Sequence, residues 1–344
     1  MDIQELLHFS VQSRASDLHI SAQLTPLLRI DGELRKIDVP PLDERATSDL
    51  LCSIMSEEQC KQLEQELEVD FSFEIPDVAR FRVNVFNQHR GLSGVFRTIP
   101  LNVKSFEELG LPRILKVISD YPHGLVLVTG PTGSGKTTTL AAMIDRINRG
   151  RHQHIITIED PIEFVHQSKS CLINQREVHG NTLSFTNALR AALREDPDVI
   201  LVGEMRDLET IRLAMTAAET GHLVFATLHT ISAAKTINRI IDAFPSGEKN
   251  MIRSILSESL QAVVSQLLLP RISGGRIATH EIMICNTAIR NLIREDKVPQ
   301  IYSALQTGGQ QGMQTLDQNL QHLVKMQEIT SETAQSIAFD KSKF

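Results

Sequence analysis

Aromatic side chains are scarce in this chain. Of its 344 residues none is tryptophan and two are tyrosine, and aromatic residues make up 4% of the total. Proteins that bind single-stranded nucleic acids usually stack the bases on aromatic side chains and present a basic surface to the phosphates. The formal net charge here is -7. We therefore expect no nucleic-acid partner.

Paired cysteines and long apolar runs are also missing. The four cysteines, Cys52, Cys60, Cys171 and Cys285, are widely spaced and form no C-x-x-C motif, so the sequence predicts neither a zinc site nor a disulfide framework. No apolar run approaches the roughly 18 to 20 residues that a membrane span needs. The first residues, MDIQELLHF, carry acids where a signal peptide carries lysines. These features predict a cytoplasmic protein without a membrane span.

The pattern of residues divides the chain into two parts. Over residues 1–100 it is typical of strands and hairpins, and near residue 80 the apolar Phe81 and Val83 alternate with Arg80 and Arg82. This alternation predicts a sheet with one apolar face and one basic face. Residues 101–122 lie in a stretch with three prolines, and we expect them to form a linker and hinge. The second domain is expected over residues 123–344.

Short apolar runs alternate with helical patterns after residue 122. The runs LVLVTG, HIITIEDP, DVILVGE and HLVFATLH have the nearly continuous hydrophobicity of buried parallel strands. The alternation predicts an α/β fold in which helices cover both faces of a doubly wound sheet. The apolar spacing over residues 246–269 predicts one long amphipathic helix, and we expect the remaining C-terminal region to be helical as well.

A phosphate-binding loop is predicted at residues 130–137, where GPTGSGKT matches the pattern G-x-x-x-x-G-K-[ST]. Its glycines let backbone N–H groups point at phosphate oxygens next to a helix amino terminus. Lys136 is expected to reach the β- and γ-phosphates of ATP, and Thr137 to place its hydroxyl on Mg²⁺. A purely structural glycine turn is the alternative, but the strand before the loop and the helix after it favour nucleotide binding.

Carboxylates that could complete such a site end two of the predicted strands. Glu204 ends the run DVILVGE, where an unpaired charge is costly unless it faces a site; a solvated strand end is the alternative. Glu159, Asp160 and Glu163 follow the run HIITI. Acids at a turn are usually just solvated, but this turn lies at the sheet edge where α/β proteins bind ligands. We expect at least one of these three acids to act.

Two histidines bracket the run HLVFATLH. In an extended strand His222 and His229 would lie about 23 Å apart, which excludes a shared metal site. The spacing favours a purely structural role for both histidines. In the functional alternative, one would contact the γ-phosphate and the other would lie at an interface. With both histidines kept as candidates, the expected nucleotide-binding residues are Gly130, Pro131, Thr132, Gly133, Ser134, Gly135, Lys136, Thr137, Thr138 and His222.

The stretch LREDPDVILVGEMRD at residues 193–207 closely resembles the signature of the type II/IV secretion ATPases, or traffic NTPases. Four boxes of that family occur in order: the Walker A loop at 130–137, the Asp box TIEDPIE at 157–163, the Walker B box ILVGEMRD at 200–207 and the His box GHLVFATLH at 221–229. AIRNLIRE at 288–295 and ASDLHIS at 15–21 resemble the branch that retracts type IV pili. An accessory retraction paralogue remains the alternative within that branch.

The resemblance implies a PAS-like α+β N-terminal domain, a RecA-like ATPase core and a homo-hexameric ring that uses ATP and Mg²⁺. By this analogy Glu204 is the Walker B carboxylate and holds the metal with Thr137, and Glu163, more than Glu159, activates the attacking water. The expected catalytic residues are Glu163, Glu204, His229 and, from the N-terminal sheet of a neighbouring protomer, Arg80, Arg82 and Arg97.

The implied function is a motor that retracts pili for twitching motility. ATP binding would close the N-terminal domain on a core, and closures around the ring would turn an inner-membrane platform protein at the pilus base. Two other classes are less favoured. A RecA-like nucleic-acid translocase conflicts with the charge and the few aromatic residues, and a small-molecule kinase would need far less chain than this.

Overall fold

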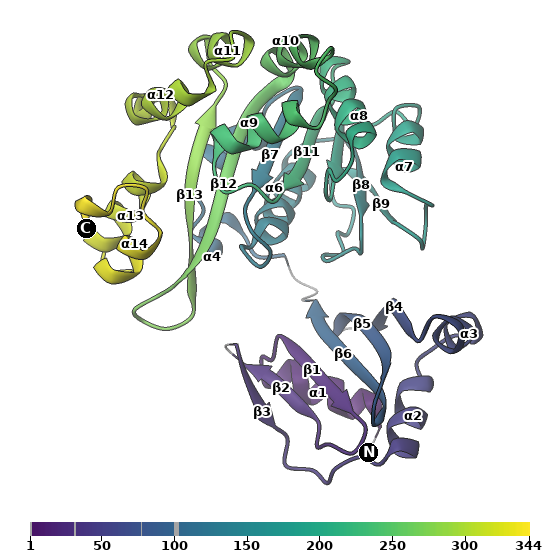
Figure 1. Cartoon of the computed structure of the whole chain (residues 1–344). Coiled ribbons are helices and arrows are strands. Elements are labelled where there is room, and N and C mark those ends of the chain that lie inside the picture. Colours follow the sequence, from purple (N-terminus) through teal and green to yellow (C-terminus); the bar gives the residue numbers. More distant parts are fainter. Residues whose placement is uncertain (1, 31, 77, 100–102) are drawn as a thin grey trace. The chain divides into compact units, whose positions relative to one another are not determined.

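The computed structural model describes residues 2–30, 32–76, 78–99 and 103–344. The chain forms two compact units, Met1–Asn102 and Val103–Phe344, which Figure 1 shows in purple to blue and in blue to yellow. Each unit has its own hydrophobic core, so each is described by itself. In the described ranges no helix is long and apolar enough to cross a membrane.

The first unit is an antiparallel sheet with three helices. The sheet order is β3-β2-β1-β6-β5-β4, and every pairing in it is antiparallel. Its elements are α1 (Ile3–Gln12), β1 (Asp17–Ser21), β2 (Leu27–Ile30), β3 (Glu33–Lys36), α2 (Glu44–Cys52), α3 (Glu57–Glu66), β4 (Glu68–Ile75), β5 (Ala79–Gln88) and β6 (Gly91–Ile99).

The predicted alternation on β5 is confirmed. Phe81 and Val83 are fully buried in the core that the sheet shares with α1 and α2, whereas Arg80 and Arg82 are half-buried and lie on the other face. Successive side chains of a strand point to opposite faces. One face of this sheet therefore packs on the helices and the other carries the arginines.

The second unit is built on a seven-stranded sheet of order β13-β12-β7-β11-β10-β8-β9. All neighbours are parallel except β12 and β13 (Figure 1). Its elements are α4 (Phe106–Leu109), α5 (Ile114–Ser119), β7 (Gly124–Thr129), α6 (Lys136–Gly150), β8 (His154–Glu159), β9 (Leu172–Glu177), α7 (Phe185–Ala192), β10 (Val199–Val202), α8 (Leu208–Glu219), β11 (Leu223–Leu228), α9 (Ala233–Asp242), α10 (Lys249–Ser259), β12 (Leu260–Pro270), β13 (Arg276–Ile284), α11 (Thr287–Arg294), α12 (Ile301–Thr307), α13 (Leu316–Lys325) and α14 (Ser331–Ile337).

Helices cover both faces of this sheet, as the alternation of runs predicts. Alternate strand residues such as Leu125 and Leu127 pack under α7 to α12 on one face, and Val126 and Val128 pack under α4 to α6 on the other. Since strands buried on both faces have no polar side, they read as continuous apolar runs. The α/β class expected from the sequence is therefore correct.

Two expectations about the chain's organisation need correction. Residues 103–122 are not a linker, because Phe106, Leu115 and Ile118 are buried in the core beneath α6; residues 100–102 of the expected linker lie outside the described residues. The helix expected over 246–269 ends at Ser259, and Leu260 begins β12. A continuous apolar run of this kind fits a buried helix and a buried strand equally well. The C-terminal region also contains β13, so it is not wholly helical.

Candidate functional site

The phosphate-binding loop connects the buried strand β7 to the amino end of α6. Gly130 and Gly135 have φ angles of 145° and 85°. Residues with a Cβ rarely adopt such positive φ angles. No side chain caps the amino end of α6, so its first N–H groups remain available to an anion. A glycine turn that leads into an uncapped helix end is a combination that can bind phosphate.

Lys136 is the first residue of α6, and its side chain reaches back to the start of this loop. Its side chain is buried, and Nζ donates hydrogen bonds to the carbonyl oxygens of Gly130 at 2.8 Å and Pro131 at 3.1 Å. Burial lowers the pKa of Lys136, and the nearby carboxylates of Glu204 and Glu163 act in the opposite direction. Both predicted carboxylates therefore lie close enough to the buried ammonium to act on its charge.

Parallel pairing brings these residues together. Thr129 at the end of β7 lies opposite Leu228 at the end of β11, and Val202 of β10 lies opposite Ile158 of β8. The carboxyl ends of all four strands therefore meet at one edge of the sheet, where ligands bind in open α/β folds. The loop, the Asp box, the Walker B box and His229 all follow these strand ends.

Glu204 is held by two partners. His229 Nε2 lies 2.9 Å from Oε1, and Arg206 Nε donates to Oε2 at 2.9 Å. Arg206 also lies 3.7 Å from the carboxylate of Asp160, so one guanidinium joins the Walker B and Asp boxes. Sequence reasoning missed Arg206, although its place two residues after Glu204 was a usable signal.

Glu159 and Glu163 have different environments. Glu159 is 6% exposed, and burial raises the pKa of its carboxyl to about 7, although hydrogen bonds from Thr157, Gln175 and the backbone of Glu163 favour the charged form. Glu163 is half-buried and interacts with Lys136. A buried carboxyl with three donors anchors the turn, whereas Glu163 is the acid of this box whose charge acts on Lys136.

Gln175 on β9 frames this turn and was also missed. Its Nε2 donates to Glu159 Oε1 at 3.2 Å and to the carbonyl oxygen of Phe164 at 2.9 Å, and its Oε1 accepts from the backbone N–H of His166 at 2.7 Å. The residues that Gln175 bonds lie before and after Glu163 in the sequence. They fix the backbone that carries Glu163.

His222 does not belong to this site. Its backbone carbonyl accepts from the N–H of Gly124 at the start of β7, which is the sheet edge opposite to the phosphate loop. Its ring Nδ1 lies 2.9 Å from the carbonyl oxygen of Ala217 near the end of α8. The expectation that His222 contacts the nucleotide is therefore corrected, since a six-residue strand separates it from that edge.

The predicted arginines lie together on the basic face of the first unit. Arg82 and Arg97 are neighbours across β5 and β6. Arg97 Nε lies 3.0 Å from Asp17 Oδ1 and Arg82 Nε 4.0 Å from Asp70 Oδ1, with 62% and 42% of the two side chains exposed. Arg80 is half-buried on the same strand face. A role for these arginines in a neighbouring protomer's site stays a prediction.

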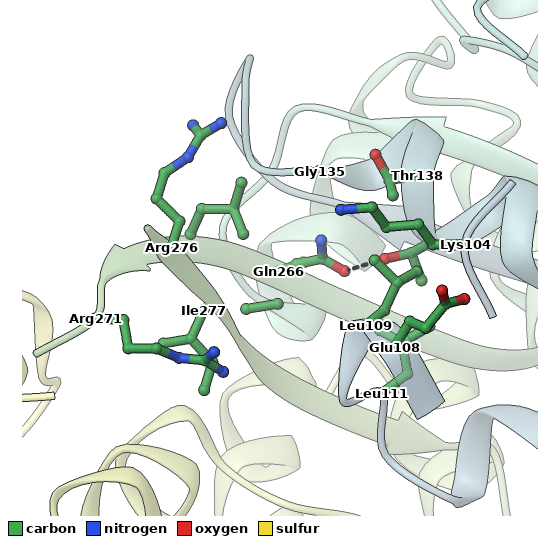
Figure 2. Close-up of a pocket in the computed structure, with 13 residues that line it drawn as sticks. Lys104, Glu108, Leu109, Leu111, Gly135, Thr138, Gln266, Arg271, Arg276 and Ile277 are labelled. Atoms are coloured by element: carbon green, nitrogen blue, oxygen red, sulfur yellow. Dashed lines mark hydrogen bonds between the residues drawn. The ribbon is translucent and has the colours of Figure 1, made fainter. Parts of the chain in front are cut away.

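A cavity of about 410 Å³ adjoins the amino end of α6. Figure 2 shows Gly135 and Thr138 at its upper edge, the α4 segment on one side and the β12–β13 hairpin on the other. Three cationic side chains and several aliphatic ones line it. The lining residues that Figure 2 labels are Lys104, Glu108, Leu109, Leu111, Gly135, Thr138, Gln266, Arg271, Arg276 and Ile277.

The chain is similar over nearly its whole length to known proteins. The model of the family "Type II/IV secretion system protein" matches residues 1–274. The chain is 64% identical to the type IV pilus retraction ATPase PilT of Pseudomonas aeruginosa over 338 residues, 98% of each chain. It is 39% identical to the type IV pilus ATPase PilU of the same organism over 335 residues, 97% of this chain and 88% of that one.

A solved structure extends this similarity to the fold. The crystal structure of the pilus retraction motor PilT with bound ADP matches with a TM-score of 0.93 and 49% identity, and the match covers 100% of this chain and 99% of that one. The fold class expected from the sequence, a RecA-like core with a smaller N-terminal α+β domain, is thereby confirmed.

Proposed function

This chain belongs to the family of type II/IV secretion system proteins, and from that membership we propose that it is an ATPase that powers the retraction of type IV pili. The identity of 64% to a PilT over nearly the full length of both chains supports this function. The identity to a PilU is 39%, so an accessory role is less favoured.

One structural observation carries the ATPase assignment. Lys136 is buried in a glycine loop at the uncapped amino end of α6, and both Glu163 and Glu204 interact with it. A cation and free helix N–H groups bind phosphate, whereas carboxylates repel it unless a metal or a water lies between. The combination therefore fits the hydrolysis of a phosphoanhydride better than simple anion storage.

Each residue has a chemical task in the proposed mechanism. The N–H groups of the loop and α6 bind the β-phosphate, and Lys136 stabilises charge on the transferring phosphoryl group. The hydroxyl of Thr137 and the carboxylate of Glu204 are oxygen ligands of the type that Mg²⁺ prefers, so they would hold the metal. Bound Mg²⁺ would neutralise charge on the phosphate oxygens. Glu163 orients the attacking water and accepts its proton.

His229 and Arg206 position the Glu204 carboxylate, because each bonds one of its two oxygens. A carboxylate oxygen has two lone pairs, so both contacts leave room for a metal or a metal-bound water. A side chain fixed from two directions loses little freedom when the nucleotide binds. This preorganisation supports the role of both residues in the site.

The adenosine part of ATP is proposed to occupy the cavity beside α6. The cavity reaches Gly135 and Thr138 at the first turn of that helix, where a nucleotide bound by the loop would continue from its α-phosphate. Aliphatic walls suit an apolar purine ring, and an arginine such as Arg271 or Arg276 can stack on it.

We further propose that six protomers form a ring at the cytoplasmic side of the inner membrane. Arg80, Arg82 or Arg97 of one protomer would reach the γ-phosphate bound by its neighbour, which is a contact that can be worth about 10³ to 10⁵ in rate. Each nucleotide state must then favour a different arrangement of the N-terminal domain and the core. The motion would act on a platform protein in the membrane.

Complementation of a deletion strain tests this function. Deletion of the gene should leave pili on the cell surface and abolish twitching, and the wild-type gene should restore twitching. Glu204→Ala should not restore it, and the purified variant should bind ADP with ATP hydrolysis reduced at least about 100-fold. The control Glu219→Ala changes an exposed acid on α8 and should restore twitching. Cells that lack pili after the deletion would indicate assembly and refute the proposal, and wild-type turnover by Glu204→Ala would refute the site.

A further inference from the structure

A polar side chain lies inside the apolar strand β12, directly behind the phosphate-binding loop. Gln266 is 2% exposed, and its Nε2 donates a hydrogen bond of 2.7 Å to the carbonyl oxygen of Ser134 in the loop. Its Oε1 accepts from Thr139 Oγ1 at 2.8 Å, a bond that Figure 2 draws as a dashed line, and lies 3.1 Å from His280 Nε2. Burying an amide without partners is costly, and here both ends of the amide have partners.

Gln266 also lies close to both glycine ends of the loop. A Cβ added at Gly130 would lie 2.2 Å from the backbone oxygen of Gln266, and one added at Gly135 would lie 2.9 Å from its Nε2. The loop therefore has no room to shift towards β12 at either end. The hydrogen bond to Ser134 holds the segment between these two close approaches.

The orientation of the Gln266 amide follows from its partners. If oxygen and nitrogen were exchanged, the amide oxygen would face the carbonyl oxygen of Ser134, and two acceptors cannot bond. With the oxygen directed away from the loop, His280 must carry its proton on Nε2 in order to donate. His280 is 2% exposed and lies opposite Gln266 in the pairing of β12 with β13, so β13 supplies a partner for the amide oxygen.

We infer that Gln266 is a positioning residue for nucleotide binding: it holds the phosphate-binding loop in the shape that accepts a diphosphate, and His280 and Thr139 hold Gln266. The inference rests on the nucleotide activity proposed above and adds a residue outside the four sequence boxes. Without Gln266 the Ser134 carbonyl has no partner on β12. The loop would then adopt several conformations, and the one that binds the nucleotide would be less populated.

Gln266→Leu tests the inference, because leucine has a similar size and no polar atom. The loss of a buried hydrogen bond corresponds to about a tenfold lower population of the binding-competent loop, so Kd for ADP should rise about tenfold. KM for ATP should rise by a similar factor while kcat at saturating ATP stays within about twofold, because bound nucleotide selects the correct loop.

Inorganic pyrophosphate, used as a competitor of a fluorescent ADP, separates the loop from the neighbouring cavity that Gln266 also lines. A positioning role predicts the same loss of affinity for pyrophosphate as for ADP. If only the affinity for ADP fell, Gln266 would act through the nucleoside cavity and not through the loop, and the inference would be overturned.

Thr279→Val is the matched control. Thr279 is fully buried on β13, and its hydroxyl bonds to Asn319 Oδ1 at 2.8 Å. The control should lower the melting temperature of the unliganded protein about as much as Gln266→Leu does and leave Kd unchanged. An equal rise of Kd in the control, or an unchanged Kd in Gln266→Leu, would overturn the inference.

Thr139→Val decides the question if Gln266→Leu does not fold, because it removes one donor to the Gln266 oxygen and keeps the glutamine. Kd for pyrophosphate should then rise by a smaller factor of about threefold; no change would overturn the inference. Failure of the wild-type protein to bind ADP would instead refute the proposed function. The two failures are therefore distinguishable.

Discussion

The stability of Glu159→Gln relative to the wild-type protein should increase as pH rises. Burial raises the pKa of this carboxyl from 4.5 to about 7, so between these values the folded state binds a proton that the unfolded state does not. The contribution of the protonated carboxyl to stability is fully present below pH 4.5 and is lost as pH rises through 7. Glutamine is neutral at every pH and keeps an oxygen that can accept from Thr157 and Gln175.

The size of the effect follows from the shift. Each pKa unit corresponds to about 1.4 kcal/mol. The free energy of unfolding of the wild-type protein should therefore fall by on the order of 3 kcal/mol relative to that of the variant as pH rises past both pKa values. About 2 kcal/mol of this loss falls between pH 5.5 and pH 8.5. For a unit of this size it corresponds to a difference of several degrees in melting temperature.

Thermal melting of both proteins without nucleotide, at steps of one pH unit from 5.5 to 8.5, measures this difference. The melting temperature of the variant relative to that of the wild type should increase as pH rises. Glu219→Gln, which changes an exposed acid on α8, should follow the wild-type curve. Parallel curves for wild type and Glu159→Gln would refute the reasoning, because they would mean that the carboxyl has the same pKa in the folded and unfolded chains.

Two further predictions concern the loop and the Walker B box. Arg206→Ala removes a bond to Glu204 and the contact with Asp160, so kcat should fall about tenfold with Kd for ADP nearly unchanged; a large rise in Kd would contradict a role in positioning Glu204. Gly130→Ala places a Cβ 2.2 Å from a backbone oxygen, whereas one at Gly133 would meet nothing within 4 Å. Kd for ADP should therefore rise much more in Gly130→Ala than in Gly133→Ala, and equal effects would show that backbone conformation alone matters.

The phosphate site could be predicted from the sequence because its chemistry is local. Glycines, Lys136 and Thr137 occur within eight consecutive residues, and a strand before them and a helix after them are enough to fix their geometry. The parallel strands could also be predicted, since a strand buried on both faces must be apolar throughout. From this pattern Glu204 and at least one of the acids Glu159, Asp160 and Glu163 were expected at the same sheet edge; the preference for Glu163 came from the family resemblance.

The assignment of roles to the acids and histidines could not be completed in this way. Glu159 and Glu163 are four residues apart in one box, and only packing buries the first and leaves the second beside Lys136. His222 and His229 bracket one strand, and their distance along it excludes His222 from the site once the location of the loop is known.

The sequence by itself predicted a phosphate-binding loop at residues 130–137 and parallel strands that end in acids at the same sheet edge. Only the tertiary structure decided what supports the loop. Gln266 and His280 are more than 100 residues away in the chain, and in the sequence Gln266 lies in a run that was predicted to be helical. Pairing of β12 with β7 and β13 brings both residues behind the loop. Contacts between distant segments depend on strand order, and local patterns carry no information about strand order.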